Sequence, residues 1–141
     1  MTQTITVRPT GSFSLALPDG ICDRRDERVS SFWVDGKPLL LQISSYVRGE
    51  GDQVPARERL ADRMAKHSEN WKVWEGKIHP DQSIDQATAE FLDAEGNLWV
   101  HSYLVWPHLS VYVTVSGPEA NVRKPANWAI NAVQSVALTI Q

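Results

Sequence analysis

Apolar and polar residues alternate along several short stretches of this chain, which is the period-two pattern typical of β-strands. Turn-forming pairs such as Asp35-Gly36 and Gly117-Pro118 separate these stretches, and such pairs favour tight reversals. The pattern predicts strands over residues 13–17, 30–34, 39–47, 71–78, 84–92, 98–106 and 109–116. The last four follow one another through short turns, so they predict an antiparallel meander.

A helical period appears in two places. The first helix is expected over residues 53–69, with Asp52 as its N-cap and with an apolar stripe of Leu60, Ala61, Met64 and Ala65. The second is expected over residues 124–137, with Pro125 at its first helical position. The mixed-sign charged run at residues 23–28 is expected to be a solvated loop.

The order of these elements predicts an α+β fold, with an antiparallel sheet of about six to seven strands packed with two main helices. A length of 141 residues fits one domain, and 42% hydrophobic with 22% charged residues is typical of a globular protein. We therefore expect one α+β domain over residues 1–141.

Charge and cysteine content narrow the classes of function. The net charge is −3 and the chain has no Lys/Arg block, so it lacks the electrostatic footprint of a nucleic-acid-binding protein. We find no secretory signal and no apolar run long enough to span a membrane. The lone Cys22 suits a reducing compartment, so we expect a cytoplasmic protein without a membrane span.

Turn chemistry predicts a register for the last three strands. A loop at residues 94–96 places Phe91 opposite Trp99, and a two-residue loop at Pro107-His108 places Tyr103 opposite Tyr112. Because strand side chains alternate between faces, one face carries Phe91, Trp99, His101, Tyr103, Tyr112 and Thr114 over the small residues Ala87 and Ala89. The other face is aliphatic and carries Leu98, Val100, Leu104, Val111, Val113 and Val115.

The aromatic face has two interpretations. Either a helix covers it, or it is a partly open amphipathic surface for a ligand or a partner segment, a role that tyrosine and tryptophan suit well. On the second interpretation the candidate binding residues are Phe91, Trp99, His101, Tyr103, Tyr112 and Thr114. A slip of either hairpin by one residue would exchange the two faces.

No catalytic or metal-binding motif is apparent. There is no glycine-rich phosphate loop, and the four histidines lack the spacing of metal ligands. His101 is the best candidate acid–base group, but the register puts Glu90 on the opposite face. The chain is therefore expected not to be an enzyme and to bind no metal or cofactor. The alternative is a small-ligand-binding protein or minor enzyme with a pocket around His101.

Residues 13–20, Phe-Ser-Leu-Ala-Leu-Pro-Asp-Gly, followed by Asp23 and Arg24, resemble the opening motif of PsbP-like domains. The order of elements is similar to that family from about residue 10 to residue 138. Size and expected location are most similar to the bacterial cytosolic branch of chaperones for type VI secretion effectors. The resemblance implies a protein-binding or chaperone domain whose partner is an apolar helix of a secreted client, with a homodimer as a further expectation.

Overall fold

The computed structural model describes residues 4–7, 12–48 and 54–139, and for residues 4–7 the backbone only. Its helices are α1 (Ala56–Ala65), α2 (Glu119–Arg123) and α3 (Trp128–Gln134). Its strands are β1 (Thr4–Val7), β2 (Phe13–Pro18), β3 (Cys22–Arg25), β4 (Ser30–Trp33), β5 (Leu40–Val47), β6 (Lys72–Val73), β7 (Asp85–Leu92), β8 (Asn97–Val105), β9 (Leu109–Pro118) and β10 (Ala137–Leu138).

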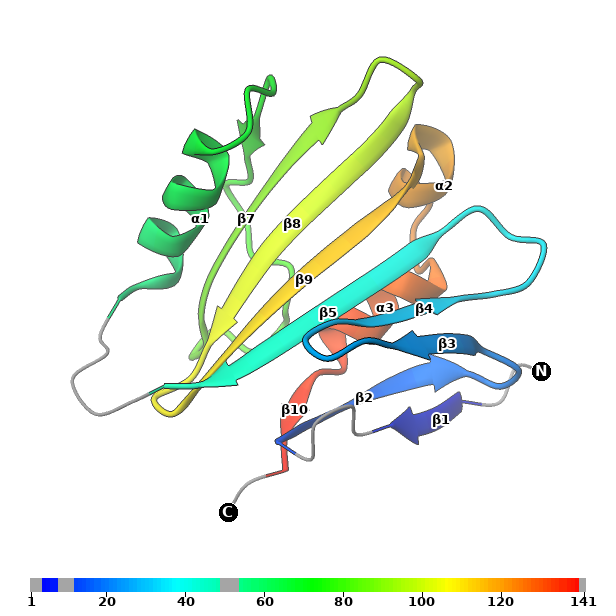
Figure 1. The fold of residues 1–141 in the computed structure, drawn as a ribbon, viewed down its shortest axis with the longest axis horizontal. Coiled ribbons are helices and arrows are strands. Elements are labelled where there is room, and N and C mark those ends of the chain that lie inside the picture. The colour runs from blue at the N-terminus through cyan, green and yellow to red at the C-terminus, as the bar shows by residue number, and fades with distance from the viewer. Residues whose placement is uncertain (1–3, 8–11, 49–53, 140–141) are drawn as a thin grey trace.

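Within the described residues, seven strands form one antiparallel sheet in the order β3-β4-β5-β9-β8-β7-β6. A smaller sheet of three strands has the order β1-β2-β10 (Figure 1). The predicted α+β class and the antiparallel meander are thus confirmed. The long strands β5, β9, β8 and β7 form the middle of the larger sheet.

The aliphatic face of the large sheet forms the main core. It packs against β2, whose Phe13, Leu15 and Leu17 are almost completely buried, and against α3 through Ala129 and Val133. Burial of each large side chain contributes about 1.5–3 kcal/mol. This layer fixes which face of the sheet looks outward.

Helix α1 packs on the opposite face of the same sheet, over β7 and β8 (Figure 1). Ala56 and Leu60 are buried there against Ala89 and Tyr103. Pro55 holds the N-cap position, and the backbone N–H of Ala56 donates to the Asp85 carboxylate at 3.0 Å. The predicted cap Asp52 lies outside the described residues.

The helix predicted over residues 124–137 is present but shorter: it is α3, Trp128–Gln134, and the preceding short helix α2 was not predicted. Residues 124–127 separate α2 from α3, because a residue before proline disfavours the helical conformation; Lys124 is extended, with ψ of 125°. Ala126 then adopts a positive φ of 58°. Asn127 starts α3 as its N-cap, accepting from the Ile130 N–H at 2.9 Å.

Two strand predictions also need correction. The strand expected over residues 71–78 is only Lys72–Val73, because the chain leaves the sheet afterwards and buries Ile78 and His79. The charged run expected as a loop is in part the exposed edge strand β3. There Arg24 pairs with Asp26, and Arg25 with Asp23, both at 3.5 Å. Strands β1 and β10 were not predicted.

Candidate functional site

The predicted register of the last three strands is confirmed. Phe91 lies opposite Trp99, Tyr103 opposite Tyr112, and His101 between Ala89 and Thr114. The six candidate residues therefore share one face of the sheet, away from the aliphatic core. The same cross-strand rows continue onto β5 and β4, where Gln42 lies opposite Thr114 and Leu40 opposite both Ser116 and Trp33.

Helix α1 covers part of this aromatic face. Tyr103 is 6% exposed beneath it, while Phe91, Trp99 and Tyr112 are half-buried. The C-terminal helices do not cover this face, since α3 packs on the other one. Among the described residues, a helix therefore covers β7 and β8 and no helix covers the rest of this face; whether the rest binds a ligand or a partner stays a prediction.

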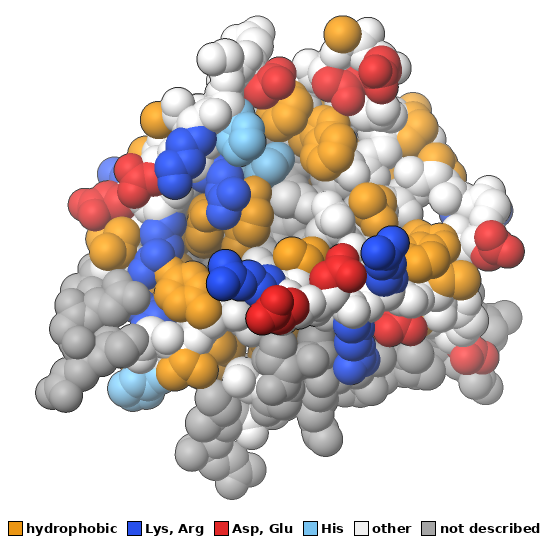
Figure 2. Space-filling view, viewed as in Figure 1, with side chains coloured by type: hydrophobic (Ala, Val, Ile, Leu, Met, Phe, Trp, Pro, Cys, Tyr) orange, Lys and Arg blue, Asp and Glu red, His pale blue; other side chains and the backbone are white. Residues whose placement is uncertain are grey.

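The uncovered remainder lies over β9, β5 and β4, and we call it the open face. Its residues are Trp33, Leu40, Gln42, Ser44 and Thr114, and Trp99 of β8 borders it. Figure 2 looks onto it and shows a hollow beside α1 whose floor is mainly white, the colour of backbone and of side chains that are neither hydrophobic nor charged. Hydrophobic side chains border the hollow, and Lys/Arg side chains gather on its α1 side.

Two arginines of α1 form the edge of the open face. The Arg63 guanidinium stacks over the Tyr112 ring, 4.3 Å from its centroid, and donates from Nε and Nη2 to the Tyr103 hydroxyl at 3.2 and 3.1 Å. Arg59, one turn earlier, stacks over Tyr46 at 4.9 Å. Cation–aromatic contacts of this kind hold each guanidinium in place.

His101 lies at the junction between the covered and open parts. Its ring packs edge-on against Trp71, with centroids 4.9 Å apart, and its Nδ1 shares a hydrogen bond with the Tyr112 hydroxyl. Burial, with the positive charges of Arg63 and His67, lowers the pKa of His101 to about 4. Burial likewise raises the pKa of Tyr112 to about 12. Both groups are therefore neutral at neutral pH.

This histidine makes the stability of the fold depend on pH. Its folded pKa of about 4 lies below the ordinary 6.5, so the unfolded chain takes up the proton first as the pH falls. The stabilisation is fully present above about pH 6.5 and is lost towards about pH 4, by roughly 3 kcal/mol. Urea unfolding across this range should show the loss in the wild type and a smaller one in His101→Gln. If the free energy of unfolding fell equally with pH in the two proteins, His101 would not be the source of the pH dependence.

A small cavity opens beside His101 on the open face. Its volume is about 260 Å³, and its lining includes Gln42, Ser44, Trp99, His101, Tyr112 and Thr114. Four of these are candidate residues from the sequence. Phe91 lies outside the lining and packs on Trp71, with centroids 4.7 Å apart. Tyr103 is sealed under α1.

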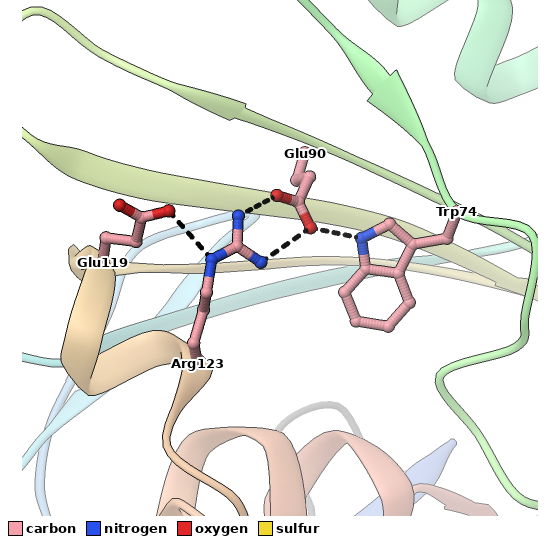
Figure 3. A network of polar contacts seen from close by, with 4 residues as sticks. All are labelled: Trp74, Glu90, Glu119 and Arg123. Atoms are coloured by element: carbon pink, nitrogen blue, oxygen red, sulfur yellow. Dashed lines mark hydrogen bonds and ion pairs between the residues drawn. The ribbon is translucent and has the colours of Figure 1, made fainter.

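Glu90 is held in a separate network on the opposite face, as the register predicts. Its carboxylate accepts from Arg123 at 2.6 Å and from the Trp74 indole N–H at 2.8 Å (Figure 3). Arg123 also donates to Glu119 at 2.9 Å. This network borders a second cavity, of about 380 Å³, between the sheet and the α2–α3 junction. The charged groups of the network, Glu90, Arg123 and Glu119, pair with one another, so we assign the network a structural role.

Removing Arg123 should therefore destabilise the fold. Arg123→Gln leaves the Glu90 side chain, 8% exposed, with only the indole donor, and we expect a loss of about 2 kcal/mol in the free energy of unfolding. Glu119→Gln is the matched control: this outer pair is about half exposed and should cost under about 0.5 kcal/mol. Urea denaturation measures both, and equal losses would argue against a structural role for the buried pair.

The remaining chemistry-bearing groups form no reactive constellation among the residues described. Both ring nitrogens of His79 already have hydrogen-bond partners. Nδ1 accepts from the Asp81 N–H at 3.1 Å, and Nε2 donates to the Val136 carbonyl at 2.8 Å. No three His, Cys, Asp or Glu side chains in the described ranges gather closely enough to hold a metal ion. No described helix has the length and apolar character needed to cross a bilayer.

Sequence reasoning missed several residues of this site. Trp33, Leu40, Gln42 and Ser44 join it because β5 pairs with β9, a non-local contact that turn chemistry does not reveal. Arg59 and Arg63 carried a signal: they lie four residues apart on one side of the predicted helix. Trp71 carried none, because its contacts depend on where the short strand β6, Lys72–Val73, begins.

Comparisons with known proteins define the fold. No protein-family model matches the sequence, and no curated protein matches it at a significant level. By structure, the chain is similar to cyanobacterial PsbP (CyanoP) from Synechocystis sp. PCC 6803, with a TM-score of 0.64 and 10% identity. The match covers 97% of this chain and 92% of that chain. The predicted PsbP-like fold is thus confirmed, while the likeness to type VI secretion chaperones stays a prediction.

Proposed function

We propose that this chain is a non-enzymatic binding module that holds a helix of a partner protein against the open face. One observation carries the proposal: α1 covers β7 and β8 of the sheet's outer face, and in the described part of the chain no helix covers β9, β5 and β4 beside it. A cross-strand row runs over these strands from Trp99 on β8, through Ser116 and Leu40, to Trp33 on β4.

The open face has room for one further helix. Strands in a sheet lie about 4.8 Å apart, so the three strands β9, β5 and β4 occupy a width of roughly 14 Å. A helix with its side chains is about 10 Å across. A partner helix beside α1 would therefore complete the outer layer as a second helix on the same sheet.

The edges of the sheet favour a helix over an added strand. Strand addition needs a long unpaired edge. Here β3 has four residues, is mostly exposed and carries Asp23, Arg24 and Arg25, and β6 has only two residues. Short, charged edge strands discourage pairing with another chain.

The residues at the open face suit an amphipathic helix with an acidic side. Trp33, Leu40 and Trp99 offer apolar contact, and tryptophan combines a large apolar area with a hydrogen-bond donor. Arg59 and Arg63 on α1 favour Asp or Glu on the helix flank that faces them. We therefore propose a partner helix with an apolar stripe and acidic residues beside it.

A chaperone or adaptor role follows from this proposal. Apolar helices aggregate when exposed to water, and a sheet face that buries the apolar stripe protects them. The resemblance to type VI effector chaperones supports such clients, and a second copy of this chain is the competing occupant. The free Cys22 supports the cytoplasm as the location we propose.

The experiment selects helices from a displayed library of amphipathic peptides about 18 residues long, near 27 Å. We expect binders with micromolar Kd for the wild type. Ser44→Arg, which fills the centre of the open face, should weaken binding at least tenfold. Ala94→Arg, the same side chain added in the exposed β7–β8 turn, should bind like the wild type. Failure to select helices, or equal affinity for both variants, would refute the proposal, and self-association lost in Ser44→Arg would favour the homodimer instead.

A further inference from the structure

The imidazole of His101 lines a cavity yet keeps one ring nitrogen without a partner. Nδ1 is engaged by the Tyr112 hydroxyl, whereas Nε2 is buried and has no hydrogen-bond partner among the described residues. Buried polar atoms are nearly always hydrogen-bonded, so each exception calls for an explanation. A ligand in the adjoining cavity would supply one once the side chains that bury Nε2 move aside, since His101 lines that cavity.

The Tyr112 contact indicates which hydrogen-bonding group is missing. A phenol is a far stronger acid than a neutral imidazole N–H, so the Tyr112 hydroxyl donates to Nδ1. The hydrogen of the neutral ring then sits on Nε2, which becomes a donor. The missing partner is therefore an acceptor atom.

The rest of the cavity provides donors and no negative charge. Ser44 and Thr114, each with a hydroxyl, line it together with His101 and Gln42, and no Asp or Glu is among the described lining residues. The Gln42 amide nitrogen donates to Ser31 Oγ at 3.3 Å and keeps one further hydrogen to donate. The Arg63 guanidinium lies over the Tyr112 ring at 4.3 Å and adds positive charge nearby. Converging donors near a cation favour an anionic acceptor, and a carboxylate has two oxygens for them.

We propose that the His101 cavity binds a carboxylate group. With about 260 Å³ of space, it takes a carboxylate on a small body of roughly ten non-hydrogen atoms. The indole of Trp99 forms part of the wall, which favours a flat apolar body. Two sources fit this chemistry: a free small carboxylic acid, or an acidic side chain of a bound helix. The site does not require the proposed helix-binding function, because a free acid would occupy it alone.

Benzoate is the test ligand, and benzamide is its uncharged control of nearly equal shape. We expect benzoate to bind with a millimolar Kd and at least about fivefold more tightly than benzamide. Affinity should rise about threefold between pH 7 and pH 5.5, since a bound carboxylate favours a protonated imidazole. Two-dimensional NMR titration, following the His101 and Trp99 side-chain signals, measures both effects.

Variants assign the binding to this cavity. His101→Gln should weaken benzoate binding about fivefold and remove its pH dependence, and Thr114→Val and Ser44→Ala should each weaken it about threefold. If His101→Gln does not fold, the other two decide the question. Equal binding of benzoate and benzamide, or benzoate affinity unchanged in the variants that fold, would overturn the proposal.

A selected helix separates the two sources. If benzoate displaces it and Glu→Gln in that helix weakens binding, the carboxylate belongs to the partner. If benzoate binds without displacing the helix, or if no helix is ever selected, the site takes a free acid. Each result supports a carboxylate site, and the second leaves it standing when the helix proposal fails.

Discussion

Replacing Ile43 by arginine is expected to abolish cooperative folding, whereas the same replacement at the next residue, Ser44, is expected to leave the protein folded. Ile43 is 2% exposed in the aliphatic core, opposite Val113. A guanidinium there loses its hydration and gains no partner, which costs more than about 4 kcal/mol. That is most of the stability of an ordinary domain, about 5–15 kcal/mol. Ser44 points to the open face, where an added arginine stays in water.

Circular dichroism with urea titration distinguishes the two variants. We expect a cooperative transition near the wild-type midpoint for Ser44→Arg, and none or a strongly shifted one for Ile43→Arg. The pair tests the assignment of faces directly, because neighbouring strand residues lie on opposite sides. Folding of both variants, or of Ile43→Arg alone, would show that the open and buried faces are wrongly assigned.

Replacing Gly117 by alanine is expected to cost about 3 kcal/mol. A Cβ at this position would lie 2.8 Å from the Pro38 carbonyl oxygen and 2.9 Å from the Leu39 side chain, and φ is +156°. Backbone oxygen cannot yield as a flexible side chain does, so the loop between β4 and β5 has to shift. That shift would strain the end of the β5–β9 pairing, at Leu40 and Ser116.

Gly96→Ala is the control for Gly117→Ala. Gly96 also has a positive φ, of +85°, but nothing lies within 4 Å of an added Cβ. Only the backbone penalty applies, so we expect a loss of about 1 kcal/mol. Thermal and urea unfolding compare the two variants, and equal losses would show that close approach to Pro38 contributes nothing.

The central part of the fold could be predicted because its signals are local. The turn-forming residues and loop lengths at 93–97 and 106–109 were enough to predict the register of β7, β8 and β9. Once the register was set, alternation alone separated Trp99 and His101 from Leu98 and Val100. The order of elements, with the opening motif at residues 13–20, then predicted the PsbP-like fold that the structural match confirms.

The remaining features depend on contacts between distant segments. The pairing of β5 with β9 extends the aromatic face to Gln42 and Ser44, and no turn encodes it. Pro125 suits a first helical position, and this local signal predicted a start three residues before the helix α3 begins at Trp128. The position of α1 over β7 and β8 decides how much of the face stays open, and an amphipathic stripe does not say which surface it will cover.

Mapping a selected helix onto the protein tests the central claim most directly. Backbone amide NMR signals of isotope-labelled protein would be compared with and without the helix identified by display. The account predicts that the largest shift changes fall on β9, β5, β4 and the flank of α1 that carries Arg59 and Arg63. Changes concentrated on α2, α3 or β2, with the open face unaffected, would contradict it.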